Sequence, residues 1–447
     1  MREAAERAVQ SARASGGSDA EAYASEATRR EVRAHGGKVE SLGAATQRGL
    51  GVRVWIEGRV GYAYGTDLSG PGVEEIAARA TSMARVADPD EFAVPPAAGE
   101  PPEVEGLNDP GIADWTTDRV AEVALSVERA ALAHDERVGG VEQAVYVDSA
   151  ERVAIASSTG AGGEFEASSC YAYAQALARG DGGRETGLGF GMGRGPRGLD
   201  AAAIGREAAE RATAMIGSDK PASRACPVVL DATVAASFVG LLGSALGADA
   251  VQRGRSPLAS LLGERVAADA FVLHDDGLVP DGFASAPVDG EGVPRRRTPL
   301  VESGILRTFL FDTYTARRGG ATSTGNAGRS GYRTAPGVAA SNLIVSPGAT
   351  SFRGLLAEAA DGVYVTDVAG LHAGVNPVTG VFSVGASGRA IRGGELAEPL
   401  REFTIASDLV SMLRSVRAAG AEPRWVPFGG SVSTPPLLIG EMTVAGS

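Results

Sequence analysis

The stretch GLGVRVWIEGRVGYAYGTDL, residues 49–68, decides the fold of the first half of the chain. Apolar or β-branched side chains alternate there with glycine and polar residues over 49–56 and again over 59–66, which is the period of a β-strand. Glu57 and Gly58 lie between the two runs, where a tight turn would join them. The stretch therefore predicts a β-hairpin.

The segments around this hairpin predict further strands and the helices that cover them. Alternating patterns predict strands at residues 19–34, 38–41, 141–148, 152–157 and 164–178. Helical spacing predicts helices at 3–14, 71–86, 117–134 and 200–216, the third capped by Thr116 or Thr117 and the fourth by Asp200. The prolines of residues 88–111 predict an extended surface crossing. Residues 1–220 are thus expected to form an α+β domain with an antiparallel sheet and helices.

The second half of the chain differs in pattern from the first. Pro221 and Pro227 bracket a polar stretch, where we expect a domain boundary. Beyond it, short strands alternate with glycines, and the helices expected are few, chiefly 237–248, 352–360 and 407–419. Residues 221–447 are therefore expected to form a glycine-rich, curled β domain.

Composition narrows the classes of function. The chain has 447 residues, 44% of them hydrophobic, and a formal net charge of −13, which disfavours nucleic acid as a partner. Residues 1–15 are charged and lack the apolar stretch of a signal peptide, and the uncharged run 232–248 is too short to span a bilayer. Cys170 and Cys226 are too few for a disulfide scaffold. We expect a cytoplasmic protein without a membrane segment.

The residues that could carry chemistry are sparse. Of the four histidines, His35 and His134 are expected to be structural, and His274 stands in HDDG, which is more typical of a turn than of a cation site. No HExxH, HxH or CxxC motif occurs, so no metal site is expected. The acidic and basic residues of 289–299 predict an exposed charge run or docking surface. The glycines of 187–195 lack the context of a dinucleotide site.

One loop, residues 370–380, has polar groups on a glycine-flanked turn. His372, Asn376 and Thr379 could form the wall of a site, or Asn376 and Thr379 could hydrogen-bond only to their own backbone. The residues by themselves show no complete catalytic constellation.

Several separated segments resemble one known family. They are the hairpin above, VQRGRSPL (251–258), SAPVDGEGVPRRRTPLVESGIL (285–306), TSTGNAGRSGY (322–332), SNLIVSPG (341–348) and GLHAGVNPVTGVFSVGASG (370–388). In this order they resemble the PmbA/TldE branch of the TldD/PmbA family. The resemblance implies a heterodimer of two related subunits that acts as a peptidase on unfolded or leader peptides, historically described as a modulator of DNA gyrase. Arg253, in the second segment, joins His372, Asn376 and Thr379 as a candidate contact for substrate or partner.

In that family, the TldD-type subunit carries an HExxxH helix whose histidines bind zinc and whose glutamate polarises water. The similar segment here is FVGLLGSAL (238–246), in which Gly240, Leu241 and Ala245 stand in place of His, Glu and His. The cysteine that catalytic relatives carry is also missing from FGGSVSTPP (428–436). The resemblance therefore implies no metal in this chain and zinc in a partner subunit.

The same helix has small residues, Gly240, Ser244 and Ala248, at every fourth position. This spacing predicts one flat face on which another backbone can approach closely. A buried core helix and a helix that shapes a peptide tunnel both fit this pattern.

Three functions follow from these observations. The first is the zinc-free subunit of a peptidase that acts with an HExxxH paralogue on peptides or amino-acid conjugates. The resemblance also implies antibiotic biosynthesis as one setting, since pairs of this family occur there in actinobacteria. The bias that leaves Lys38 and Lys220 as the only lysines is that of a GC-rich genome and agrees with such a source. The second is a non-enzymatic binding or regulatory protein, and the third an independent metal-free hydrolase, which lacks a nucleophile and base.

Overall fold

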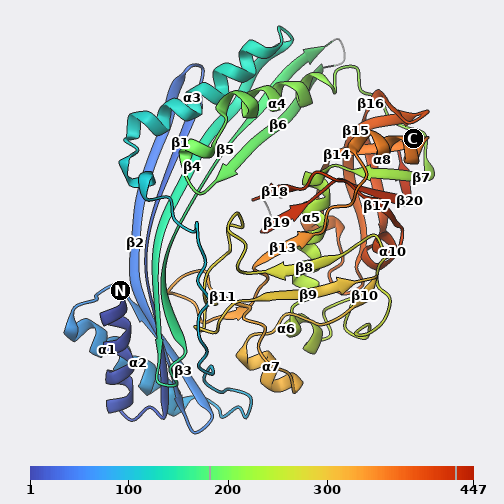
Figure 1. The fold of residues 1–447 in the computed structure, drawn as a ribbon. Coiled ribbons are helices and arrows are strands. Elements are labelled where there is room, and N and C mark those ends of the chain that lie inside the picture. Colours follow the sequence, from blue (N-terminus) through green and yellow to red (C-terminus); the bar gives the residue numbers. More distant parts are fainter. Residues whose placement is uncertain (181–182, 428–429, 447) are drawn as a thin grey trace.

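The structure is a computed structural model, and it describes residues 1–180, 183–427 and 430–446. Its first part is one long antiparallel sheet in the order β3-β2-β1-β4-β5-β6 (Figure 1). The strands are β1 (Asp19–His35), β2 (Lys38–Ile56), β3 (Arg59–Gly65), β4 (Val138–Ser157), β5 (Gly162–Gly180) and β6 (Gly183–Gly193). The helices are α1 (Arg2–Ala14), α2 (Gly70–Val86), α3 (Thr117–His134) and α4 (Ala201–Thr213).

The predicted hairpin of residues 49–68 is confirmed, because Trp55 pairs with Val60 across the turn at Glu57 and Gly58. Two other expectations were wrong. Residues 38–56 form one continuous strand, β2, rather than separate runs. It pairs with β1 from Lys38, opposite His35, to Trp55, opposite Asp19. Residues 138–157 likewise form one strand, β4, rather than the two expected at 141–148 and 152–157. Residues 187–195 lie largely in β6, against whose Gly187 and Gly189 the backbone of α4 packs closely.

The two faces of β1 have different neighbours. Its even-numbered residues face the helices: Ala20, Ala22 and Ala24 pack with α1 and α2, and Val32 and Ala34 pack with α3 and α4. Its odd-numbered Glu21 and Tyr23 are also buried, because the C-terminal half covers the opposite face at this end. One end of the sheet is thus covered on both faces.

The C-terminal half contains two larger sheets, in the orders β16-β15-β14-β7-β20-β17 and β10-β9-β8-β13-β19-β18 (Figure 1). Their strands are β7 (Arg224–Leu230), β8 (Leu273–Asp276), β9 (Arg297–Glu302), β10 (Ile305–Leu306), β13 (Asn342–Val345), β14 (Gly362–Ala369), β15 (Val381–Arg392), β16 (Glu395–Asp408), β17 (Val416–Ala419), β18 (Arg424–Val426), β19 (Ser431–Thr434) and β20 (Leu437–Ala445). The short pair β11 (Ala327–Gly328) and β12 (Gly337–Val338) lies apart from them.

Helices are few in the described residues of this half, as expected, and most of them are short. They are α5 (Ala232–Ala245), α6 (Ala248–Gln252), α7 (Thr313–Gly319), α8 (Phe352–Ala359), α9 (Leu371–Gly374) and α10 (Leu409–Arg414). The helix expected at 407–419 is wrong in its second part, because the chain leaves α10 to form β17, which pairs with β20.

The fold class, α+β with a helix-backed antiparallel sheet followed by a β-rich part, agrees with the prediction. The expected boundary between residues 220 and 221 falls between α4 and β7, and the division into two units stays a prediction.

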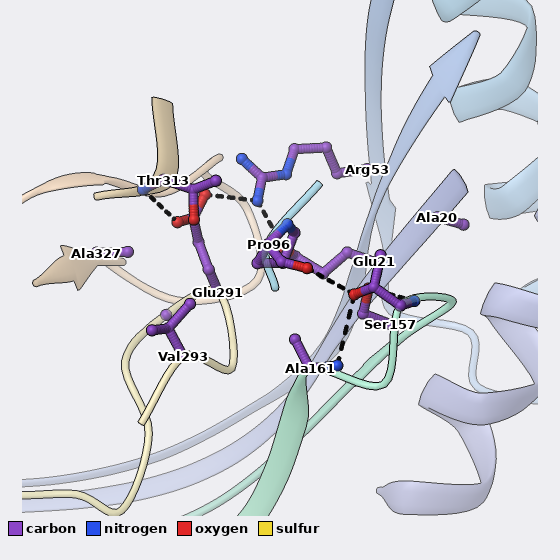
Figure 2. A network of polar contacts seen from close by, with 12 residues as sticks. Ala20, Glu21, Arg53, Pro96, Ser157, Ala161, Glu291, Val293, Thr313 and Ala327 are labelled. Atoms are coloured by element: carbon purple, nitrogen blue, oxygen red, sulfur yellow. Dashed lines mark hydrogen bonds and ion pairs between the residues drawn. The ribbon is translucent and has the colours of Figure 1, made fainter. Parts of the chain in front are cut away.

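A buried ionic network joins the two halves at the covered end of the first sheet. The Arg53 guanidinium of β2 donates to Glu21 at 2.5 Å and to Glu291 at 2.7 Å, and the two glutamates are 0% and 1% exposed. Glu291 also accepts from the N–H of Thr313 at 3.0 Å, at the start of α7 (Figure 2). Arg329 donates to the other oxygen of Glu21. The exposed charge run expected at 289–299 is therefore wrong for its acidic residues, which are buried.

Candidate functional site

The helix α5 is fixed at its first turn by a buried aspartate. The carboxylate of Asp231 caps the helix by accepting from the N–H of Thr233 at 2.9 Å, and it accepts from the Tyr364 hydroxyl at 2.7 Å and from Arg211 at 3.3 Å. Burial opposes its ionisation, but Arg211 and these hydrogen bonds hold the pKa of Asp231 below its ordinary value. The orientation of α5 is thus set by side chains of α4 and β14.

One face of α5 borders a cavity of about 330 Å³, which we call the α5 cavity. The helix contributes Gly240, Gly243 and Ser244 to its wall. The segment before β13 and the strand β19 contribute most of the other side: Ala339, Ala340, Ser341, Ser431 and Val432. The small side chains of the helix leave this space open.

The three positions that the resemblance relates to a metal helix have different surroundings. Gly240 lines the α5 cavity, Leu241 packs against the hydrophobic core, and Ala245 is buried at 7% exposure. The expected small-residue stripe is interrupted, because α5 ends at Ala245 and Ala248 starts α6. This helix is mostly buried, and its less buried face borders a cavity.

The residues of this region do not fit a zinc ion. The α5 cavity is lined by no histidine or cysteine, and Asp249 is its one carboxylate among the residues that line it. Throughout residues 1–180, 183–427 and 430–446, no three His, Cys, Asp or Glu side chains gather as a metal ion would require. Residues 428 and 429 of the segment expected to lack a cysteine lie outside the described residues.

A buried polar network holds the wall of the α5 cavity in place. Asp275 of β8 accepts from the N–H and the hydroxyl of Ser341, both at 2.6 Å, and from the amide of Asn326 at 2.8 Å. Asn342 donates to the carbonyl of Asp276 and accepts from the N–H of Ala284. Burial raises the pKa of Asp275, against these hydrogen bonds. The turn expected for HDDG lies at its end: His274 and Asp275 are in β8, and the Asp276 carboxylate accepts from the N–H of Leu278 across the turn at Gly277.

The loop of residues 370–380 lies apart from the cavity. His372, Asn376 and Thr379 are exposed, and none of them lines the α5 cavity. The Asn376 side chain accepts from the N–H of Val378 at 2.9 Å and of Thr379 at 3.1 Å. The polar groups of this loop therefore stabilise its own turn, and the loop remains a candidate contact for a partner.

The other histidines have structural surroundings. His35 contacts the carbonyl of Val141 at 3.1 Å, and His134 lies 3.5 Å from Glu210. His274 is 7% exposed, and burial lowers its pKa. None of the three lines the α5 cavity.

Arg253, the remaining candidate, lines a second cavity of about 460 Å³, which we call the junction cavity. Its walls come from β2 and β3, from the crossing near Asp88 to Val94, and from α6, α7 and β12. Asp249 and Val338 line both cavities, so the two are neighbours. Sequence reasoning missed Asp249 and Asp312 here, because a single aspartate beside a short helix has no distinctive pattern.

Comparisons with known proteins agree with this fold along the whole chain. Models of the PmbA/TldA metallopeptidase match in three parts: domain 1 at residues 20–84, the central domain at 110–216 and the C-terminal domain at 223–446. The metalloprotease PmbA of Escherichia coli O157:H7 is 28% identical over 97% of this chain and 94% of its own length. A PmbA homologue from Haemophilus influenzae is also 28% identical, over 100% and 96%.

Solved structures show the same architecture. A Thermotoga maritima protein described as a candidate modulator of DNA gyrase has a TM-score of 0.91 and 28% identity, with 99% of each chain covered. TldE from Thermococcus kodakarensis has the same fold, with a TM-score of 0.91 at 22% identity over 99% of this chain and 100% of that one. No helix in the described part of the chain is both long and apolar enough to cross a bilayer. The family models, which together match most of the sequence, establish that the chain belongs to the PmbA/TldD metallopeptidase family.

Proposed function

We propose that this chain is the zinc-free subunit of a heterodimeric peptidase of the TldD/TldE type. The observation that carries the proposal is that Gly240, Leu241 and Ala245 offer no metal ligand while the same helix borders an open cavity. A zinc ion held by an HExxxH paralogue would supply the Lewis acid and activated water for amide hydrolysis. This chain would bind and position the substrate, a peptide or an amino-acid conjugate.

The α5 cavity suits a flexible substrate. Gly240, Gly243, Ala339 and Ala340 have at most a methyl group, so the main chain of an extended peptide can approach the wall closely. Asp275 fixes Ser341, whose position then does not depend on the substrate. Peptide maturation in antibiotic biosynthesis is one use that such a site would serve.

Two exposed features favour a partner subunit. In β2, residues 38–48 are exposed and, within the described part of the chain, pair only with β1. They form a long strand edge that includes the exposed Val39 and Leu42. Such edges tend to pair with another chain unless they are covered. In the loop beside His372, Val378 and Val381 are 47% and 54% exposed. A partner that covers either feature would remove apolar surface from water.

The test compares the purified chain with its mixture with an HExxxH paralogue. We expect no stoichiometric zinc in the chain alone, and chelator-sensitive cleavage of unfolded peptides only in the mixture. Ser244→Trp, which fills the α5 cavity from an exposed position, should reduce turnover at least tenfold without preventing assembly. Ser82→Trp, on the exposed face of α2, is the matched control and should leave turnover unchanged.

Other outcomes would favour the other functions. Chelator-insensitive cleavage by this chain alone would identify an independent hydrolase. A complex that binds partner proteins but cleaves no peptide would identify a regulatory protein. Equal turnover of the Ser244→Trp and Ser82→Trp complexes would remove the α5 cavity from the substrate path.

A further inference from the structure

The junction cavity has a lining that, apart from Asp249 and Val338, is separate from that of the α5 cavity used by the proposed peptidase function. It lies between the first sheet and the C-terminal half, and its volume of about 460 Å³ is within the range of small-molecule sites. Trp55, Val60, Val94, Pro336 and Val338 give it apolar walls. Charged side chains from α6 and α7 complete it.

Two carboxylates are brought together in this cavity by the backbone. Gly247 and Leu310 form a parallel bridge, with the N–H of Ala248 donating to the carbonyl of Leu310 at 2.9 Å. Asp249 and Asp312 each follow two residues after this bridge, and both line the cavity. The bridge therefore brings the segments that carry both side chains to the wall of one cavity.

Neither carboxylate is neutralised by the protein. Within the described residues, Asp249 is half-buried and takes part in no ion pair or side-chain hydrogen bond. Asp312 is 5% exposed; its Oδ1 accepts from the N–H of Thr315 at 2.8 Å and from its hydroxyl at 2.6 Å, whereas Oδ2 has no partner among them. Burial, and then the nearby Glu291 carboxylate, raise the pKa of Asp312, and the Arg53 guanidinium offsets this rise in part. A cation in the cavity would relieve the cost of keeping the buried Asp312 charged.

The basic residues that line the cavity are Arg53, Arg253 and the exposed Arg318, and none of them forms an ion pair with Asp249 or Asp312 within the described residues. Arg53 is already bound to Glu21 and Glu291. Arg253 stands four residues after Asp249, a spacing at which opposite charges often pair, yet no ion pair joins them. The exposed Arg253 guanidinium is thus available for a negative group at the cavity mouth.

The neighbouring Gln252 adds an unsatisfied acceptor. Its amide nitrogen donates to the carbonyl of Thr315 at 2.7 Å, while its Oε1 is buried and accepts no hydrogen bond within the described residues. Buried acceptors without a donor are rare in folded proteins. Gln252 lines the cavity, so a donor on a bound molecule would satisfy this oxygen.

We propose that the junction cavity binds a small zwitterion, a free amino acid or dipeptide. Its ammonium group lies against Asp249 and Asp312, its carboxylate faces Arg253, and its side chain packs on the apolar walls. This inference concerns a second site and does not rest on zinc or on a partner subunit.

Calorimetric titration of the purified full-length chain with L-alanyl-L-alanine tests the proposal. We expect saturable binding that N-acetylation of the dipeptide abolishes and that amidation of its carboxylate weakens. Asp249→Asn and Asp312→Asn should each weaken binding about tenfold or more, because each removes a charged hydrogen-bond acceptor. Asparagine can still cap α7, so Asp312→Asn is expected to fold. Arg253→Gln should reproduce the effect of amidation.

Asp114→Asn, an exposed carboxylate that does not line the cavity, is the control and should bind as the unmodified chain does. Equal affinity for the free and N-acetylated dipeptides would overturn the proposal. So would unchanged affinity in both aspartate variants, or no binding of alanine or alanyl-alanine at millimolar concentration. Because no peptide cleavage is measured, failure here leaves the proposed peptidase function standing.

Discussion

At the scale of single residues, Asp289 is a buried acid whose ionisation opposes folding. It is 2% exposed and accepts from the N–H groups of Glu291, Val293 and Ala327 at 2.9 to 3.0 Å. Burial, and then the nearby Glu291 carboxylate, raise the pKa of Asp289 to about 7. Since the folded pKa lies above the unfolded value, the stabilisation from this group is complete at acidic pH and is lost as the pH rises through about 7.

The Asp289→Asn variant should therefore lose less stability than the unmodified chain between pH 5 and pH 8. The difference between the two losses should be roughly 2 kcal/mol, because each unit of pKa shift corresponds to about 1.4 kcal/mol. Thermal unfolding at a series of pH values measures it. Asp114→Asn, at an exposed carboxylate, should keep the slope of the unmodified chain. Parallel profiles for all three proteins would contradict the assignment.

At the residue scale, the chemistry of a side chain is readable from the sequence, whereas its burial is not. Gly240, Leu241 and Ala245 carry no metal-ligating group by residue type alone, and their relation to a metal helix rests on the resemblance. The burial of Glu21, Asp275 and Glu291 is not readable, because each becomes buried through residues far away in the chain, such as Arg329, Ser341 and Arg53. In an alternating strand or a glycine-rich loop, the local sequence around a buried carboxylate looks the same as that around an exposed carboxylate.

At the scale of elements, the β1–β2 hairpin is held by a side chain from α3. Gly36 and Gly37 turn the chain with φ of +63° and +73°, and their N–H groups donate to the Glu128 carboxylate at 2.6 and 3.0 Å. Alternation predicted strands here, but not one strand of this length, because SLGAATQR (41–48) carries small and polar residues that are exposed along both faces. The helix caps were predicted correctly, since Thr116 and Asp200 act locally.

Glu128→Ala should loosen the hairpin without unfolding the sheet. It leaves two backbone donors without their buried acceptor, which should cost about 2–3 kcal/mol. Hydrogen exchange should become faster at residues 32–42 and remain unchanged in β5 and β6. Glu122→Ala, on the exposed surface of the same helix, is the matched control. Equal exchange rates in the two variants would show that the turn needs no support from α3.

At the scale of the whole molecule, polar contacts connect the N-terminal part with the C-terminal half at several places. One is the Glu21–Arg53–Glu291 network near the crossing, and another joins α4 to the C-terminal half through Arg211 to Asp231 and Glu207 to Arg424. The N-terminal sheet is therefore connected toward both of its ends. Helix and strand patterns could not predict this arrangement, because it depends on charges that meet only after the halves have packed.

Arg53→Met should uncouple the halves at one end only. It removes the shared cation and leaves Glu291 buried with a single N–H donor, and breaking such a buried pair typically costs about 3–5 kcal/mol. Since the tie through Arg211 and Arg424 persists, we expect faster proteolysis within residues 88–111, where Asp90 contacts Tyr314 of α7. The ion pair of Arg152 with Glu164 is exposed, so the Arg152→Met variant should be cleaved by the protease no faster than the unmodified chain. If both variants were cleaved at the same rate, the connection between the halves would lie in their apolar contacts rather than in this network.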